Sequence, residues 1–240
     1  MTISRRDLIL MSGSTLAGLS VGALKAETLE AQAPAAQQQP WPDSLVEMER
    51  RPNFPWKLPL NADGSAPEHP ASAAGPITDP LMWRTPNRQP PEIDFDYKNM
   101  KIKVDTRRLA KLGGTLRFSD LDKLPKVSKT YLMQCGAENP RGIVKWTGVK
   151  FSDFAGILGL AEGVHYCRFI ASDKHYVDEA MATLNHPQVM LAWMMNDAPI
   201  PPKHGAPLRL IIPFRYGNRS IKAITEIVFG TPSLPAPPAA

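Results

Sequence analysis

Proline is the feature that most constrains how this chain can fold. It accounts for 25 of the 240 residues, about twice its usual share of about 5%. Proline fixes one backbone angle and lacks the amide N–H, so it interrupts long helices and central strands. The prolines are densest in residues 34–80 and 231–240. This distribution predicts extended segments and short strands rather than a helical bundle.

Short apolar runs between these two segments predict the body of the fold. Because 43% of the residues are hydrophobic, the chain has enough apolar surface for one domain with its own core. We expect an α+β domain, mainly β, made of mixed short strands with few helices over residues 81–230. A Pro-rich arm (34–80) precedes it and a flexible tail (231–240) follows. The strands are expected at residues 101–104, 115–118, 129–134, 166–170, 190–194, 208–212 and 224–229.

Two serines are expected to start short helices inside this domain. Ser119 is followed three residues later by Asp122, the spacing of a capping pair, which predicts a helix that runs to Leu124. Ser152 precedes an apolar stretch and is expected to cap a helix that runs through Leu158.

The first 33 residues resemble a twin-arginine export signal. Arg5 and Arg6 precede a weakly apolar stretch (8–24) that is diluted by Gly and Ser, and cleavage is expected after Ala26 or Ala33. A membrane anchor is the alternative, although the stretch is short for a membrane span. The resemblance implies that the twin-arginine machinery exports the folded protein to the periplasm, a route typical of proteins that receive a redox cofactor in the cytoplasm.

Charge and cysteine content narrow the function classes. The net charge is +5, but no basic stripe alternates with aromatic residues, so we do not expect nucleic acid as a partner. No phosphate-binding loop, dinucleotide fingerprint or nucleophile elbow is present. Cys135 and Cys167 lack the spacing of a zinc site or a haem attachment motif, and one disulfide between them is an alternative. A redox role would therefore require electron exchange with another protein.

A series of motifs in a fixed order carries the most specific signal. Cys135 ends a predicted strand, and four blocks follow it: Asn139-Pro140-Arg141-Gly142, Trp146-Thr147-Gly148-Val149, His204-Gly205-Ala206-Pro207-Leu208-Arg209 and Gly217-Asn218-Arg219-Ser220-Ile221-Lys222. This order resembles the molybdopterin-binding domain of the sulfite oxidase family. The family commonly has Cys-Ala-Gly-Asn-Arg, whereas two further residues separate Cys135 from Arg141 here.

The resemblance implies a molybdenum-molybdopterin (Mo-MPT) cofactor with Cys135 as the protein's metal ligand. A thiolate suits such a soft centre, and Arg and Lys suit the cofactor's phosphate. Arg141 and Tyr216 are the further catalytic candidates, and Lys145 is a neighbour of the site. The cofactor-binding candidates besides Cys135 are Arg84, Asn87, Ser172, Asp173, His204, Arg209, Ser220, Ile221 and Lys222. Cys167 lies in an apolar strand pattern and is expected to be structural.

The family resemblance implies oxygen-atom transfer, and three functions stay open. The first is oxidation of sulfite or a related sulfur compound, with electrons passed to a c-type cytochrome. The second is a sulfoxide reductase catalytic subunit that acts on methionine sulfoxide and is fed by a membrane haem subunit. The third is a periplasmic interaction domain without catalysis. The substrate would be a small oxyanion or a sulfoxide.

Overall fold

The computed structural model describes residues 55–76, 83–137 and 139–231. They belong to one compact unit that spans residues 50–240. The expected export signal, the first part of the Pro-rich arm and most of the tail lie outside the described residues. Among the described helices, none is long and apolar enough to cross a membrane.

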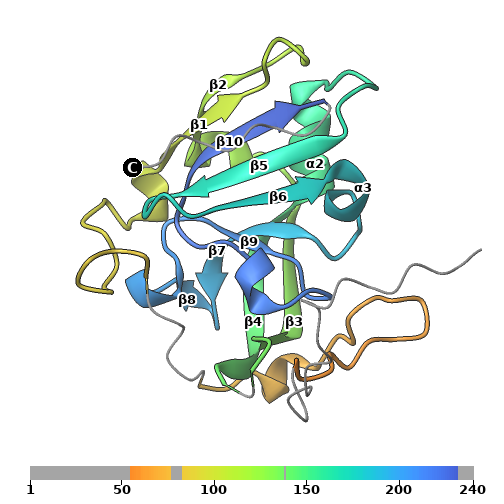
Figure 1. Cartoon of the computed structure of the whole chain (residues 1–240), viewed down its shortest axis with the longest axis vertical. Helices are drawn as coiled ribbons and strands as arrows, with labels where there is room; N and C mark the ends of the chain where they lie inside the picture. Colours follow the sequence, from red (N-terminus) through yellow and green to blue (C-terminus); the bar gives the residue numbers. More distant parts are fainter. Residues whose placement is uncertain (1–54, 77–82, 138, 232–240) are drawn as a thin grey trace, which may run out of the picture. The chain divides into compact units, whose positions relative to one another are not determined.

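One of the two sheets formed by the described strands is mixed (Figure 1). Its order is β2-β1-β10-β5-β6, in which β1 and β10 are parallel and the other pairs antiparallel. Ile102 and Val104 are buried while Lys101 and Lys103 face solvent, as expected for a strand with one buried face. The strands are β1 (Lys101–Asp105), β2 (Gly114–Arg117), β5 (Tyr166–Ala171), β6 (Tyr176–Ala180) and β10 (Ile224–Gly230).

The second sheet contains the long hairpin that carries Cys135. Its order is β3-β4-β7-β8, and β9 also pairs with β7. β3 and β4 are paired without a break from Lys126 and Val149 to Gln134 and Arg141, so the described residues 135–137 and 139–140 lie in the turn of the hairpin. The strands are β3 (Lys126–Gln134), β4 (Arg141–Lys150), β7 (Met190–Met195), β8 (Ala198–Pro199) and β9 (Arg209–Ile211).

The helices are few and short, which together with the strands confirms the predicted mainly β class. The described α-helices are α1 (Phe118–Leu121), α2 (Phe151–Leu158) and α3 (Met181–Leu184); the 3-10 helices are η1 (Ala71–Ala73), η2 (Tyr97–Asn99), η3 (Pro202–His204) and η4 (Gly217–Arg219).

The two predicted serine caps are wrong. Ser119 lies inside α1, which begins one residue earlier because Asp120 Oδ2 accepts the Arg117 backbone N–H at 2.9 Å. Ser152 lies inside α2, which begins at Phe151, directly after β4. The Phe151 side chain is fully buried and its N–H donates to Val189 O at 3.0 Å. The buried side chain of Phe151 therefore anchors the start of α2, where a serine cap was expected.

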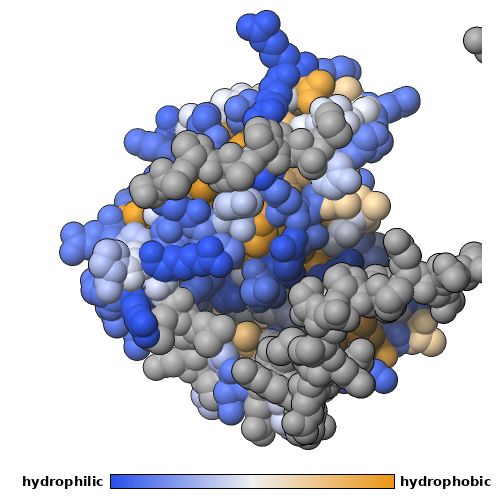
Figure 2. Space-filling view, in the orientation of Figure 1, coloured by the Kyte–Doolittle hydropathy of each residue, from blue (hydrophilic) through white to orange (hydrophobic). Residues whose placement is uncertain are grey.

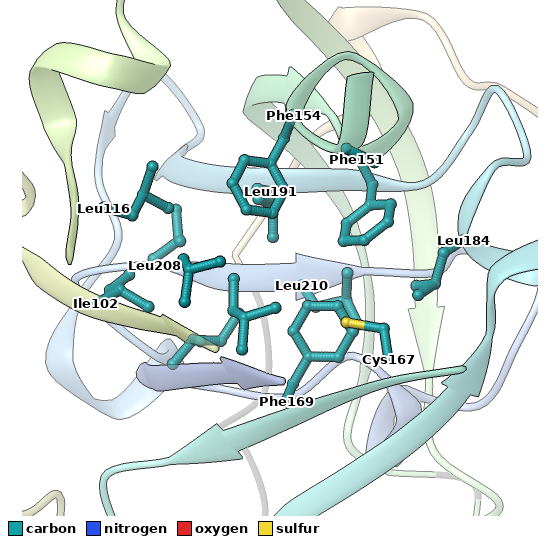
Figure 3. Packing of buried hydrophobic residues seen from close by; sticks show 14 of the residues in the cluster. Ile102, Leu116, Phe151, Phe154, Cys167, Phe169, Leu184, Leu191, Leu208 and Leu210 are labelled. Carbon is teal, nitrogen blue, oxygen red and sulfur yellow. The ribbon is translucent and has the colours of Figure 1, made fainter. Parts of the chain in front are cut away.

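The main core contains Cys167 among large apolar side chains (Figure 3). Phe151, Phe169 and Leu184 are all buried in this cluster, and Figure 3 shows the sulfur of Cys167 beside the ring of Phe169. Burial raises the pKa of the Cys167 thiol well above its usual value. Both cysteines are free, so the disulfide alternative is wrong and Cys167 packs as a small hydrophobic residue.

Residues 55–76 extend along the β3–β4 hairpin. His69 N donates to Thr130 O at 2.8 Å, and Gln188 exchanges two hydrogen bonds with the backbone of Ala66. At the hairpin turn, Trp56 N donates to Gly136 O at 2.9 Å, and Gln134 Nε2 donates to Trp56 O at 3.1 Å. This segment therefore supports the turn that carries Cys135.

Candidate active site

The sequence motifs meet at one cavity of about 230 Å³. It lies where the β3–β4 turn, the β5–β6 turn and the segment from β9 to β10 come together. The lining residues are Arg84, Met133, Gln134, Cys135, Pro140, Arg141, Trp146, Asp173, His175, His204, Arg209, Gly217, Asn218, Ser220, Ile221 and Lys222.

Cys135 sits at the tip of the hairpin, half-buried and with a free thiol. Its backbone N–H donates to Pro140 O at 3.1 Å across the turn. Arg141, exposed at the start of β4, pairs with Gln134 and lines the same cavity. A Cβ on Gly217 would lie only 3.4 Å from Gln134 O. Because η4 approaches the end of β3 so closely, the turn with Cys135 and the segment with Ser220 face one cavity.

Arg209 is a buried cation held by backbone oxygens. Its Nη1 donates to His204 O at 2.8 Å, and its Nε donates to Ser220 O at 3.2 Å. The guanidinium lies 5.2 Å from the ring centroid of Trp146, a favourable cation–π arrangement. Burial lowers the pKa of Arg209 to about 10, so the side chain keeps its charge at neutral pH. A buried positive charge facing a cavity favours an anionic ligand.

Lys222 brings a second cation into the cavity. Its Nζ lies 3.9 Å from the ring centroid of Trp83. Burial, and then the charge of Arg209, lower the pKa of Lys222 to about 8, while Asp173 acts in the opposite direction. A Cβ on Gly205 would lie 2.7 Å from the Cβ of Lys222, and Gly205 has a φ of 108°. Glycine at position 205 is therefore required for the stem of Lys222 to pack there.

Ser220 is oriented by the backbone of β9 and its neighbours. Its Oγ accepts the Ile212 N–H at 3.0 Å, which leaves the hydroxyl proton as a donor. The preceding residue, Arg219, donates from Nε to Glu179 Oε1 at 2.6 Å and from its second terminal nitrogen to Asp178 O. This ion pair ties η4 to β6 beside the cavity.

Most of the sequence-predicted site residues line the cavity together. Those that do are Arg84, Cys135, Arg141, Asp173, His204, Arg209, Ser220, Ile221 and Lys222. Three of the predicted residues do not line the cavity: Ser172, Tyr216 and Asn87. Ser172 is half-buried next to the lining residue Asp173, and Tyr216 precedes η4. Asn87 lies in an exposed turn, where its side chain accepts the Gln89 N–H. Lys145 instead pairs with Asp197 Oδ1 at 2.7 Å.

Trp146 and His175 are lining residues that the sequence analysis did not assign to the site. Trp146 Nε1 and His175 Nδ1 are both buried without a hydrogen-bond partner among the described residues. Trp146 stood in a recognised motif, and His175 follows a polar turn after a strand, but neither pattern indicated a ligand contact. Unpartnered buried polar atoms at a cavity are expected where a bound group completes the site.

Together, a half-buried thiol, the buried cation of Arg209, the half-buried cation of Lys222 and unpartnered polar atoms make a cavity that suits an anionic ligand. The family model described as "Oxidoreductase molybdopterin binding domain" matches residues 88–236. The chain belongs to this family of oxidoreductases, whose cofactor is molybdenum-molybdopterin.

The similar proteins include sulfoxide reductase subunits and a sulfite oxidase. A protein of Azospira oryzae, provisionally described as protein-methionine-sulfoxide reductase subunit YedZ1, is 29% identical over 71% of this chain and 62% of its own length. The catalytic subunit MsrP of protein-methionine-sulfoxide reductase from Campylobacter jejuni is 31% identical over 57% and 50%. Mitochondrial sulfite oxidase of Drosophila melanogaster is 30% identical over 48% of this chain and 25% of its own length.

A solved structure supports the fold. The sulfane dehydrogenase SoxCD from Paracoccus pantotrophus matches 80% of this chain and 57% of that chain, with a TM-score of 0.52 and 16% sequence identity. This likeness supports a sulfite-oxidase-type fold for the two described sheets. The chain spans 62% or less of the length of the curated relatives named above.

The residues present fit the family's cofactor. Molybdopterin carries a phosphate, a pterin with mixed donors and acceptors, and its own sulfur ligands for the metal. Arg209 and Lys222 are suited to the phosphate because both are cations at the cavity. Cys135 offers a free thiol at the cavity, and a thiolate is the kind of soft ligand that such a metal accepts. Trp146 Nε1 and His175 Nδ1 are polar atoms that a bound group can satisfy.

Proposed function

We propose that this protein catalyses oxygen-atom transfer as the catalytic component of a sulfoxide reductase. The observation that carries the proposal is the meeting of Cys135, Arg209, Ser220 and Lys222 at one cavity. The balanced reaction takes a sulfoxide, two electrons and two protons to a thioether and water. When bound, the molybdenum centre supplies oxygen-atom exchange coupled to these two electrons.

The side chains of this protein bind and orient the reactants. Cys135 acts as the metal's protein ligand, and Arg209 and Lys222 hold the cofactor phosphate. Arg141 lies exposed beside Cys135 at the end of the hairpin, where its guanidinium can donate to the oxygen of a substrate. Met133, two residues before Cys135, gives this side of the cavity an apolar side chain, which suits a neutral sulfoxide with apolar substituents.

The direction of transfer is inferred from the relatives. Sulfite oxidation is the first of the functions expected from the sequence, but several of the similar proteins are catalytic subunits of protein-methionine-sulfoxide reductases. Methionine sulfoxide is therefore the substrate we propose. Sulfite oxidation is the second candidate, supported by the similarity to a sulfite oxidase and by the block from Gly217 to Lys222.

Two assays on the same molybdenum-loaded preparation test this proposal. Reduction of methionine sulfoxide is followed with reduced benzyl viologen as electron donor, and oxidation of sulfite is followed with ferricyanide as acceptor. The proposal predicts a higher kcat/KM for the sulfoxide. Faster sulfite turnover would support the second candidate instead, and full molybdenum content without turnover in either assay would support an interaction domain.

The proposal also includes the location of the protein and the partner with which it exchanges electrons. The paired Arg5 and Arg6 support export of the folded protein to the periplasm by the twin-arginine machinery. A haem protein, either a membrane subunit or a c-type cytochrome, would then exchange the electrons. Replacing both arginines with lysine should trap the precursor in the cytoplasm, as measured by cell fractionation. Normal periplasmic accumulation of that variant would contradict this route.

A further inference from the structure

The β5–β6 turn, residues 172–175, is a rigid element on the wall of the cavity. Ala171 N donates to His175 O at 2.8 Å, and Lys174 N donates to Ala171 O at 3.0 Å. Ser172 N donates to Ala223 O at 3.0 Å, which holds the turn against the residue that follows Lys222. The side chains of this turn are therefore fixed next to the cationic part of the cavity.

Asp173 uses both of its carboxylate oxygens to hold the backbone. Oδ1 accepts the His175 N–H at 3.1 Å, and Oδ2 accepts the Arg84 N–H at 3.0 Å. Asp173 thus joins the β5–β6 turn to the segment before β1. These contacts give Asp173 a positioning role, beside the direct contact with the cofactor that the sequence resemblance implies.

Two other polar atoms of the same turn have no partner. Ser172 Oγ and His175 Nδ1 are buried and make no hydrogen bond among the described residues. Leaving such atoms buried and unsatisfied lowers stability, so native proteins rarely retain them without a ligand. Because His175 also lines the cavity, its unpartnered nitrogen is an independent sign of a bound group.

The surroundings of His175 keep its imidazole neutral. Burial, followed by the charges of Arg84, Arg219 and Lys222, lowers the pKa of His175, and only the charge of Asp173 acts against them. A neutral imidazole has one donor and one acceptor. One donor and one acceptor on the same ring can bind the edge of a heterocycle that also has donors and acceptors. A phosphate, by contrast, presents only acceptors.

We infer that His175 binds the pterin ring of the cofactor, while Arg209 and Lys222 bind its phosphate. This inference rests on the proposed function, because it requires that the chain carries molybdopterin. His175 then offers a neutral donor and acceptor on the β5–β6 turn, whereas the segment from β9 to β10 offers the cations of Arg209 and Lys222. His175 is then a cofactor contact that the family motifs do not contain.

The test compares cofactor-loaded protein with the same full-length chain from a host that makes no molybdopterin. His175→Ala should release pterin about tenfold faster, as expected for one lost hydrogen bond in a buried site. Its melting temperature should fall in the loaded form and stay unchanged in the cofactor-free form. His175→Gln, which keeps a donor and an acceptor, should restore most of the retention. His165→Ala, at an exposed position, is the matched control and should behave as wild type.

Three outcomes separate the possibilities. Pterin release from His175→Ala at the wild-type rate would overturn the inference and leave the proposed function standing. An equal loss of melting temperature in the loaded and cofactor-free forms would also overturn it, since it would show a structural role. Wild-type protein without molybdenum and pterin, from a host that makes the cofactor, would overturn the inference and the proposed function together.

Discussion

The ammonium group of Lys222 lies 3.9 Å above the indole ring of Trp83. The contact joins the segment before β1 to the segment before β10, and it places a cation in the cavity beside the buried Arg209. A cation–π contact offsets part of the cost of burying Lys222, and an anion bound nearby would offset more. Lys222 should therefore report directly on whether the cavity holds an anionic group.

Cofactor-free protein should become more stable as the pH rises from about 8 toward 10.5. The pKa of Lys222 is about 8 in the folded chain, against an ordinary value of 10.5. Between these values the unfolded chain binds a proton that the folded chain has released, so the free energy of unfolding rises with pH. Lys222→Met should remove this contribution. Urea unfolding of the wild type and of Lys222→Met across this pH range measures the contribution. If the free energies of unfolding of the two proteins changed with pH in parallel, the result would contradict a buried charge on Lys222.

Arg209→Ala should lower cofactor content and thermal stability together. The guanidinium is expected to make charge-assisted bonds to the cofactor phosphate, and a lost bond of this type weakens binding about tenfold or more. Bound cofactor stabilises the folded chain by mass action, so the melting temperature should fall with occupancy. Metal analysis measures the effect, with the exposed Arg117→Ala as control. Full molybdenum occupancy in Arg209→Ala would remove this residue from the site.

The sequence predicted the strands that bury one apolar face, because alternation is visible in a run such as residues 101–104. It did not predict β6, whose residues include Asp178 and Glu179. These carboxylates are tolerated because Arg168 pairs with Asp178 at 2.6 Å and Arg219 pairs with Glu179. Such pairs join residues that are distant in the sequence, so a local pattern carries no sign of them.

The ordered motifs predicted most of the candidate site, whereas residues that reach it only through tertiary contacts were missed. Cys135, Arg209 and Lys222 stand in motif blocks and meet at the cavity. His175 and Trp83 reach the site only through the folding of the β5–β6 turn and of the segment before β1. Their contribution depends on burial and on missing partners, which only three-dimensional contacts reveal.

Gly148 and Gly156 should respond in opposite ways to substitution by alanine. A Cβ on Gly148 would overlap the Leu191 carbonyl oxygen and lie 2.7 Å from Ala192 Cα, so it would force β4 and β7 apart. We expect Gly148→Ala to destabilise the protein by about 3 kcal/mol or more. A Cβ on Gly156, exposed in α2, would meet nothing within 4 Å, and alanine there should stabilise by about 0.5 to 1 kcal/mol. Denaturant titrations of both variants provide the comparison.

Cys135 and Cys167 should differ sharply in function. Cys167 is fully buried in the apolar core, so Cys167→Ala should cost about 1 kcal/mol of stability and keep activity. Cys135 is half-buried at the cavity, and Cys135→Ser should abolish turnover with the fold intact. Circular dichroism and a turnover assay on each variant separate these expectations.

X-ray absorption at the molybdenum edge tests the central claim most directly. If Cys135 is the protein's metal ligand, Cys135→Ser should lose one sulfur neighbour from the molybdenum shell, while Cys167→Ala keeps the wild-type spectrum. The measurement needs no turnover, so it distinguishes a lost ligand from a merely inactive enzyme. A molybdenum–sulfur shell in Cys135→Ser that is unchanged from wild type would contradict the account.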